Sequence, residues 1–239
     1  MIQPSRFAAP VLLGAVLVLA GTAAPSAAQQ YVVDDAEIVD RGACHVEAWH
    51  GERASWILPA CHPIRNLEVA AGAGFIEVGT GHRETEYAIE AKTLLRPLSP
   101  GGWGVGLVVG VGPNPSAEAG ERHFGDIYAF VPASLSVADD RLIFHGNLGW
   151  EWEREDAEAR DEHFLTWGVR GDLALHERLS FIGELHSEND EQPAFQVGVR
   201  IHRPDAGVEM DLSWSGHTDG ERQGAGFTVG VAFVSGRIF

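Results

Sequence analysis

Twelve segments of this chain share one pattern, in which apolar side chains occupy every second residue between turn-forming residues. Successive side chains of a β-strand point to opposite faces, so each segment predicts a strand with one apolar and one polar face. Single-chain bacterial outer-membrane barrels contain an even number of such strands. We therefore expect an all-β fold, a transmembrane antiparallel up-and-down β-barrel of about 12 strands. The predicted strands are 43–50, 54–61, 66–78, 85–97, 103–111, 126–138, 141–153, 163–175, 178–186, 194–203, 207–215 and 224–239.

The connections between these segments alternate in length. Tight turns at 97–102, 139–140, 176–177 and 204–206 alternate with longer charged loops at 79–84, 112–125, 154–162, 187–193 and 216–223. Short turns on one rim and long loops on the other are typical of outer-membrane barrels. Counting strands places both ends of the barrel on the short-turn rim.

The predicted strands also indicate which face meets lipid. A soluble barrel such as a lipocalin would turn its apolar side inward and its charges to water. Several segments here are longer than ten residues, and Trp and Tyr recur near their ends as in the aromatic girdles of membrane barrels. We therefore expect the apolar face to point outward into the membrane.

The final segment, 224–239, alternates Phe227, Val229, Val231 and Phe233 against small residues and ends on Phe239. A closing strand with an aromatic end is typical of outer-membrane barrels, so we expect Phe239 to be the signal that assembly machinery recognises. Arg237 lies where an apolar residue is more usual.

The beginning of the chain predicts export. Arg6 precedes a run of small and aliphatic residues, and small residues end at Ala28, as in a signal peptide over 1–28. The alternative is an uncleaved anchor, for which this run is marginally long enough. We expect 29–42 to form a periplasmic N-terminal segment and 43–239 the barrel. The net charge of −17 argues against nucleic-acid binding, because phosphates need Lys and Arg.

Charged residues on the polar faces predict a charge band in the lumen. Counting outward from each turn places Arg170 opposite Glu184, Glu184 opposite Arg200, and Arg200 near Glu209, with His145 and Asp211 close by. The same counting pairs Glu68 with Lys92 and puts Glu90 and Arg96 on their face. Rings of charge can select what passes a pore. Alternating signs also suit an ion-pair network that fills and closes the lumen, and both interpretations stay open.

Cys44 and Cys61 lie at equal distances from a predicted turn near Glu52. After export into an oxidising compartment, they predict a cross-strand disulfide near the short-turn rim. Two unpaired cysteines are the alternative. Pro59 suggests a bulge beside it in the second strand.

Enzyme motifs are not evident. The eleven His residues show no metal-site spacing such as HExxH, and there is no GxSxG motif or phosphate-binding loop. We expect no catalytic residues, cofactor or metal, with an outer-membrane hydrolase as the minor alternative. The acidic runs 153–162 and 188–191 are either solvated loop charge or ligands for divalent cations that bridge lipopolysaccharide.

Short stretches along the mature chain resemble one family. They are Asp34-Asp35-Ala36 with Gly42 and His45-Val46-Glu47, then Trp56-Ile57-Leu58-Pro59-Ala60, Asn66-Leu67-Glu68, Lys92-Thr93-Leu94-Leu95-Arg96-Pro97-Leu98 and Gln196-Val197-Gly198-Val199-Arg200. The chain thus resembles proteobacterial outer-membrane proteins labelled as transporters or as "MetA-pathway of phenol degradation" proteins. The resemblance implies an outer-membrane channel, and the label implies an aromatic solute. It offers no catalytic residues.

The expected function is therefore passive passage of a small molecule across the outer membrane. A sealed structural or loop-binding barrel is the alternative. The expected partners are outer-membrane lipid, lipopolysaccharide, the periplasmic and outer-membrane assembly machinery, and an unidentified small solute.

Overall fold

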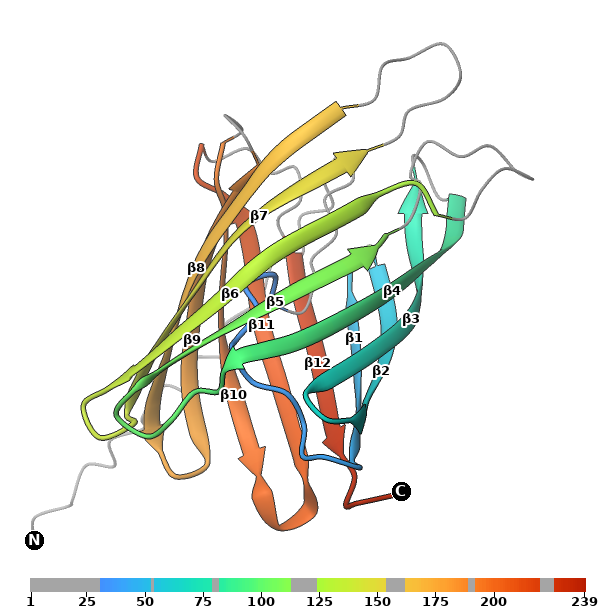
Figure 1. Cartoon of the computed structure of the whole chain (residues 1–239). Helices are drawn as coiled ribbons and strands as arrows, with labels where there is room; N and C mark the ends of the chain where they lie inside the picture. Colours follow the sequence, from blue (N-terminus) through green and yellow to red (C-terminus); the bar gives the residue numbers. More distant parts are fainter. Residues whose placement is uncertain are drawn as a thin grey trace, which may run out of the picture.

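The protein folds into a closed barrel of twelve antiparallel strands (Figure 1). The computed structural model describes residues 31–52, 54–78, 82–112, 124–153, 162–188, 192–219 and 226–239. The strands are β1 (Cys44–Gly51), β2 (Ala54–Ile64), β3 (Leu67–Val78), β4 (His82–Arg96), β5 (Trp103–Val111), β6 (Ile127–Val137), β7 (Leu142–Glu153), β8 (Glu162–His176), β9 (Leu179–Glu188), β10 (Ala194–Arg203), β11 (Val208–His217) and β12 (Gly226–Val234). A single turn of 3-10 helix, η1 (Pro204–Ala206), connects β10 to β11.

Each strand pairs with its neighbours in sequence, and β1 closes the sheet by pairing with β12 from His45–Val234 to Gly51–Thr228. Closure leaves no strand edge unpaired, which removes the main hazard of an open sheet. The predicted fold class and strand number are confirmed.

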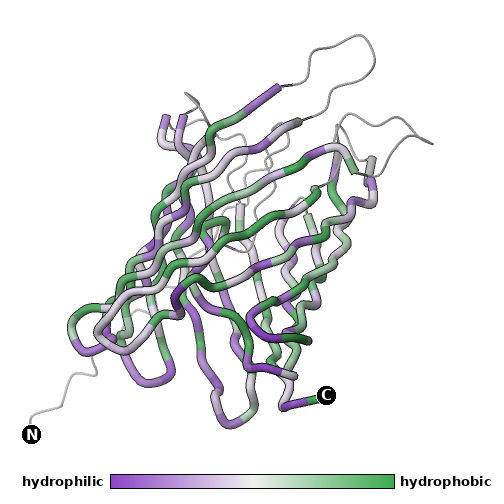
Figure 2. The backbone as a smooth tube through the Cα atoms, viewed as in Figure 1, coloured by the Kyte–Doolittle hydropathy of each residue, from purple (hydrophilic) through white to green (hydrophobic). Residues whose placement is uncertain are grey.

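The two faces of the barrel differ as the alternation predicted. On β12, Phe227, Val229, Val231 and Phe233 are 42–59% exposed on the outside. Thr228, on the inner face of the same strand, is only 2% exposed. Figure 2 shows the same alternation of hydrophobic and hydrophilic residues along many strands. No helix within the described residues is long and apolar enough to cross a membrane.

Short connections gather at one end of the barrel, together with the C-terminus (Figure 1). They comprise residues 65–66, 97–102, 138–141, 177–178 and 204–207. The longer connections link the strands at the opposite end. Most residues of the acidic runs 153–162 and 188–191 lie outside the described residues, so their predicted role stays a prediction.

The C-terminal strand ends earlier than predicted. β12 stops at Val234 instead of continuing to Phe239. The hydroxyl of Ser235 accepts a hydrogen bond from the Cys44 amide at 2.9 Å, and the amides of Ile238 and Phe239 both donate to the Gly42 carbonyl. These bonds satisfy the backbone without a ladder and fold the end of the chain over Gly42. Phe239 is 55% exposed there, and its role in assembly stays a prediction.

Three register shifts interrupt the regular pairing, and one of them lies in β8 between Ala174 and His176. In β2 the register shifts between Cys61 and Ile64, and not beside Pro59 as predicted, because Pro59 keeps its regular place opposite Val46. In β4 the register shifts between Leu94 and Arg96. A bulge inserts one extra residue and so reverses the facing of every side chain beyond it.

Candidate functional site: the barrel lumen

An extended stretch before β1 crosses the inside of the barrel (Figure 1). We call residues 31–39 the lumen segment. Val33 is 1% exposed and Ala36 is fully buried, although both belong to a stretch without regular secondary structure. The sequence predicted that residues 29–42 form a periplasmic N-terminal segment that leads into the first strand. The contacts below place residues 31–39 inside the barrel instead.

Glu184 of β9 binds the start of the lumen segment. Its two carboxylate oxygens accept hydrogen bonds from the amides of Val32 and Val33, at 2.9 and 3.0 Å. Arg170 of β8 donates to the Val33 carbonyl at 2.5 Å. The ring of Tyr31 lies within 6 Å of the guanidinium groups of Arg170 and Arg200, in cation–π contact with both.

Asp34 and Asp35 anchor the middle of the lumen segment. The ammonium group of Lys92 on β4 lies 2.9 Å from Asp34 and 3.2 Å from Asp35. Asp35 also lies 3.9 Å from Arg170 on β8, four strands from β4 in the barrel. Burial by itself would raise the pKa of Asp35, but the cations Lys92 and Arg170 hold that pKa below its usual range. The segment thus links β4 to β8 through the ionised carboxylate of Asp35.

A Ser–His–Asp series lies under Ala36, and of its members only His145 was predicted from the sequence to lie near the charge band. Ser134 on β6 accepts the Ala36 amide at 2.8 Å and contacts Nδ1 of His145 on β7 at the same distance. Nε2 of His145 lies 3.7 Å from Asp172 on β8. Ser134 is 3% exposed and already accepts a backbone hydrogen bond, so the geometry suits positioning of the segment and not nucleophilic attack.

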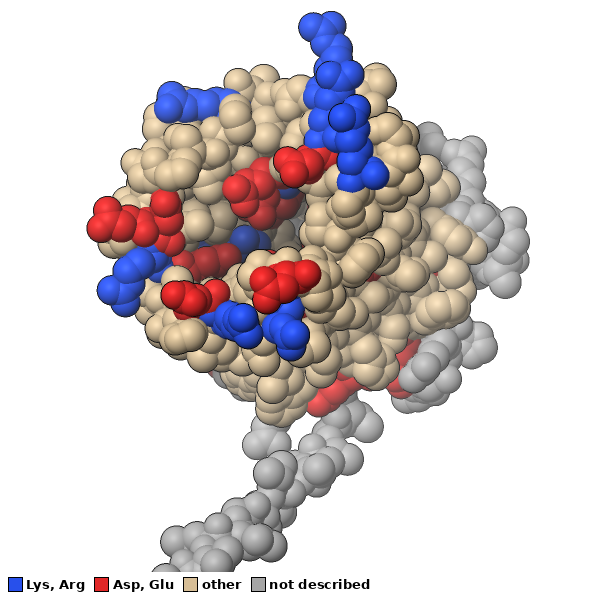
Figure 3. Space-filling view, turned by 90° about the horizontal axis from the view of Figure 1, so that it is seen from below, with Lys and Arg blue, Asp and Glu red and all other residues tan. Residues whose placement is uncertain are grey.

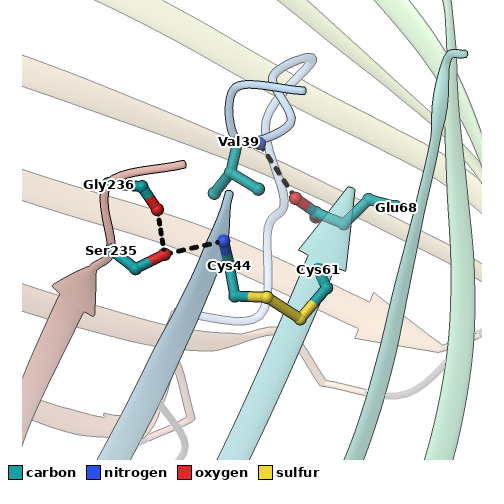
Figure 4. The surroundings of a disulfide bond; sticks show 6 residues. All are labelled: Val39, Cys44, Cys61, Glu68, Ser235 and Gly236. Carbon is teal, nitrogen blue, oxygen red and sulfur yellow. Dashed lines mark hydrogen bonds between the residues drawn. A yellow bond between two sulfur atoms is a disulfide. The ribbon is translucent and has the colours of Figure 1, made fainter. Parts of the chain in front are cut away.

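The lumen segment leaves the barrel beside the first hairpin (Figure 4). The Val39 amide donates to Glu68 of β3 at 2.9 Å, and the Val39 carbonyl contacts Nδ1 of His62 at 2.7 Å. The predicted disulfide between Cys44 and Cys61 is present and joins β1 to β2 as a cross-strand pair. It therefore fixes the hairpin at the point where the segment turns into β1.

The predicted charge band is right in two of its pairs. Arg170 lies directly opposite Glu184, and Glu68 lies directly opposite Lys92. Both pairs were counted from connections whose centres were predicted correctly. His145 also lies opposite Arg170, as expected for a neighbour of the band.

One predicted pair is wrong. Glu184 lies opposite Gln196 and not Arg200. Arg200 lies near Glu209 as predicted, at 3.4 Å, and it lies directly opposite Asp211, with which it forms two hydrogen bonds. Glu209 itself lies opposite His202. The predicted registers of β10 differ from the observed ones because the centres of the two connections that flank β10 were placed incorrectly.

Glu90 and Arg96 were both predicted to share the inner face of β4 with Lys92, and only Glu90 lies there. The bulge in β4 turns Arg96 to the outer face, where its guanidinium lies 4.0 Å from the ring centre of Trp103. Glu90 stays on the inner face and accepts a hydrogen bond from Tyr128 at 3.1 Å. Arg96 is therefore excluded from the lumen band.

The lumen thus contains charges of both signs that are largely matched to the chain itself. Lys92, Arg170 and Arg200 each contact at least one carboxylate within 3 Å. From the short-turn end, the surface is hollowed, and acidic and basic side chains surround the hollow (Figure 3). The described residues contain no cluster of three or more side chains arranged to hold a metal ion.

Comparison with known proteins places the chain in a family. A family model described as "Uncharacterised conserved protein UCP029691" matches residues 15–234. The chain belongs to this family. The match does not support the phenol-degradation label that the short motifs suggested. No curated protein matched the UCP029691-family chain.

Solved structures similar to this UCP029691-family protein are porins. One is "KdgM porin in complex with disordered oligogalacturonate", with a TM-score of 0.57 at 9% identity, covering 80% of this chain and 98% of the porin. Another is the NanC porin, with a TM-score of 0.55 at 9% identity, covering 82% of this chain and 100% of the porin. At this identity the similarity shows the fold alone.

Proposed function

We propose that this UCP029691-family protein is an outer-membrane channel for small solutes, narrowed from within by its own lumen segment. The observation that carries the proposal is the closed twelve-stranded barrel with an apolar outer face and a charged, hollowed inner one. An apolar band on a closed barrel suits lipid, and polar lumen residues suit water and solutes. The fold shared with porins is consistent with this role.

The solute does not follow from the fold. One similar porin is named with oligogalacturonate, and the family resemblance in the sequence suggested an aromatic compound. The aromatic suggestion remains part of this proposal, because aromatic side chains line the long-loop half of the lumen. We further propose that the outer face contacts lipid, that the long loops meet lipopolysaccharide, and that assembly machinery recognises the end of the chain at Phe239.

A sealed barrel is the second candidate, and the lumen segment is the observation that favours it. The segment is hydrogen-bonded to β3, β6, β8 and β9 and ion-paired to β4, so it obstructs part of the lumen. Twelve strands enclose more space than the side-chain-filled barrels of eight strands. An extended backbone alone need not fill that space, and for this reason we favour a narrowed channel.

Conductance in planar lipid bilayers distinguishes the two candidates. The purified, refolded protein is added to a bilayer in about 1 M KCl, and current is recorded at fixed voltage. A channel gives discrete current steps, and a narrowed one gives smaller steps than an open barrel of twelve strands. Insertion into the bilayer, verified by protease protection, without any current steps would show that the barrel is sealed.

A further inference from the structure

Two aromatic rings lie directly against the inner wall of the barrel because glycines leave room for them. A Cβ atom placed on Gly74 of β3 would come within 2.3 Å of the Trp56 ring from β2. A Cβ atom placed on Gly110 of β5 would come equally close, at 2.3 Å, to the Tyr128 ring from β6. Each ring therefore covers the backbone of a neighbouring strand.

Each of these rings has an aromatic partner. Trp56 stacks on Trp49 of β1, with ring centres 6.1 Å apart and planes 18° from parallel. Tyr128 stacks on Phe130 of its own strand, with ring centres 6.2 Å apart and planes 19° from parallel. Two stacked pairs thus line the lumen, one on β1 and β2 and the other on β6.

Two carboxylates lie between the aromatic pairs. Glu86 on β4 is the cross-strand partner of Gly74, next to the Trp pair. Glu90 on β4 is the cross-strand partner of Gly110, next to the Tyr–Phe pair, and accepts the Tyr128 hydroxyl at 3.1 Å. We call this surface the aromatic wall, and it consists of Trp49, Trp56, Glu86, Glu90, Tyr128 and Phe130. All six side chains are partly exposed.

The aromatic wall lies on the long-loop side of the lumen segment and away from its cations. Along β4, Glu86 and Glu90 come between the loop end of the strand and Lys92, which holds the segment. Of the Lys and Arg side chains on the inner face of the described strands, Arg170 and Arg200 complete the set, and both contact carboxylates at the level of the segment. Lys92 is the nearest of these cations to the wall, two residues from Glu90 on the same face of β4, and it is itself paired with Asp34 and Asp35.

Aromatic faces attract cations through their quadrupole, and carboxylates attract cations through their charge. An anion at the same place would face two carboxylates and the negative faces of the rings. We propose that the aromatic wall binds small organic cations, such as primary amines attached to an aromatic or aliphatic body. This inference rests on the proposed channel function and names the class of solute that the channel selects.

Binding is tested with three probes of one shape and different charge. Phenethylamine, phenylacetate and 2-phenylethanol are titrated into the refolded full-length protein by calorimetry at pH 8, where the amine is protonated and the acid ionised. The expected result is binding of the amine at least about tenfold tighter than of the alcohol, and no measurable binding of the acid. Equal binding of amine and acid, or tighter binding of the acid, would overturn the inference.

Variants locate the binding to the wall. Glu86→Gln combined with Glu90→Gln keeps the shape of the wall and removes its charge, so amine affinity should fall by about tenfold or more. Asp205→Asn is the matched control, because this carboxylate lies in the β10–β11 turn, is 77% exposed and pairs with Arg178. The heat-dependent gel mobility of each variant reports whether the barrel is folded. Unchanged amine affinity in a folded Glu86→Gln, Glu90→Gln variant would refute the assignment.

Bilayer currents separate this inference from the channel proposal. If the protein conducts and phenethylamine interrupts the current while phenylacetate does not, both stand. If it conducts and the amine has no more effect than the acid, the solute class is wrong and the channel remains. If it never conducts but still binds the amine at the wall, the channel proposal fails and the binding site remains.

Discussion

Several contacts inside the barrel converge on Arg170. It is 7% exposed, hydrogen-bonds Asp172 and the Val33 carbonyl, and approaches Asp35 and the Tyr31 ring. A buried cation with this many partners holds several carboxylates that would otherwise repel one another. Its loss therefore leaves uncompensated charge on β8 and on the lumen segment.

We expect Arg170→Ala to lower the free energy of unfolding by about 3–5 kcal/mol, the range for one partner removed from a buried ion pair. Arg170→Lys keeps the charge but not the planar group that pairs with Asp172, so it should lose less. Urea unfolding in lipid vesicles, followed by Trp fluorescence, measures both. Wild-type stability in Arg170→Ala would contradict the central place of this residue.

Asp35 gives a prediction about pH. Its pKa is lower in the folded protein than in an unfolded chain, because Lys92 and Arg170 outweigh the opposing effect of burial. Such a group stabilises the fold above its unfolded pKa of about 3.9, and the contribution is lost as pH falls through the lower folded value. The contribution of Asp35 to the attachment of the lumen segment should therefore stay constant from neutral pH to about pH 5 and be lost only in stronger acid.

Protease cleavage of the lumen segment at stepped pH, with an acid-stable protease, measures this dependence. Asp35→Asn should expose the segment already at neutral pH. If the difference in cleavage between the wild-type protein and Asp35→Asn disappears between pH 7 and pH 5, the assigned role of Asp35 is contradicted.

At the scale of elements, the lumen segment is what sequence reasoning could not place. It has no periodicity, and its partners Glu68, Lys92, Ser134 and Glu184 come from four strands far apart in sequence. A usable signal was present: two adjacent acids, Asp34 and Asp35, precede a barrel whose inner face was predicted to carry buried cations. Matching those charges would have placed the segment inside.

Cross-linking tests that placement. Val33 fills the space above Gly168 of β8, with its Cγ2 atom 2.6 Å from where a Cβ would lie. Val33→Cys with Gly168→Cys should therefore form a disulfide during oxidative refolding, since the Val33 side chain already occupies the space that a side chain at position 168 would enter. Peptide mapping by mass spectrometry distinguishes the new bridge from that between Cys44 and Cys61.

The control for this experiment is Val33→Cys with Gly101→Cys. Gly101 lies in the β4–β5 turn, where a Cβ would have no neighbour within 4 Å. Bridging of both pairs to the same extent, or of neither, would show that the segment is not held against β8.

The strand pairs show how far counting along the sequence can reach. The turn at 177–178 is tight, so its centre is known and Arg170 falls opposite Glu184. The β9–β10 connection is longer, and a misplaced centre put Arg200 where Gln196 lies. The η1 turn shifted the β10–β11 pairing by two residues, and the β4 bulge reversed Arg96. Side-chain alternation is local and predictable, whereas register depends on backbone geometry in the connections.

At the scale of the whole molecule, the protein combines a barrel suited to a membrane with a lumen that is partly occupied by the chain's own segment. The fold could be predicted because twelve alternating segments admit few other closed arrangements. The state of the lumen could not, because strand number leaves room for either an open or a filled interior. We propose that the lumen segment leaves the channel open but narrowed, which predicts a measurable effect of the segment on ion flow.

Single-channel conductance of the wild-type protein and of a variant lacking residues 31–39 tests this claim most directly. Both proteins are refolded, checked for heat-dependent gel mobility and recorded in the same bilayer and salt. We expect discrete steps from both, with larger steps from the variant, because the deletion removes backbone and side chains from the conducting path. Steps of equal size would contradict the claim that the segment narrows the channel.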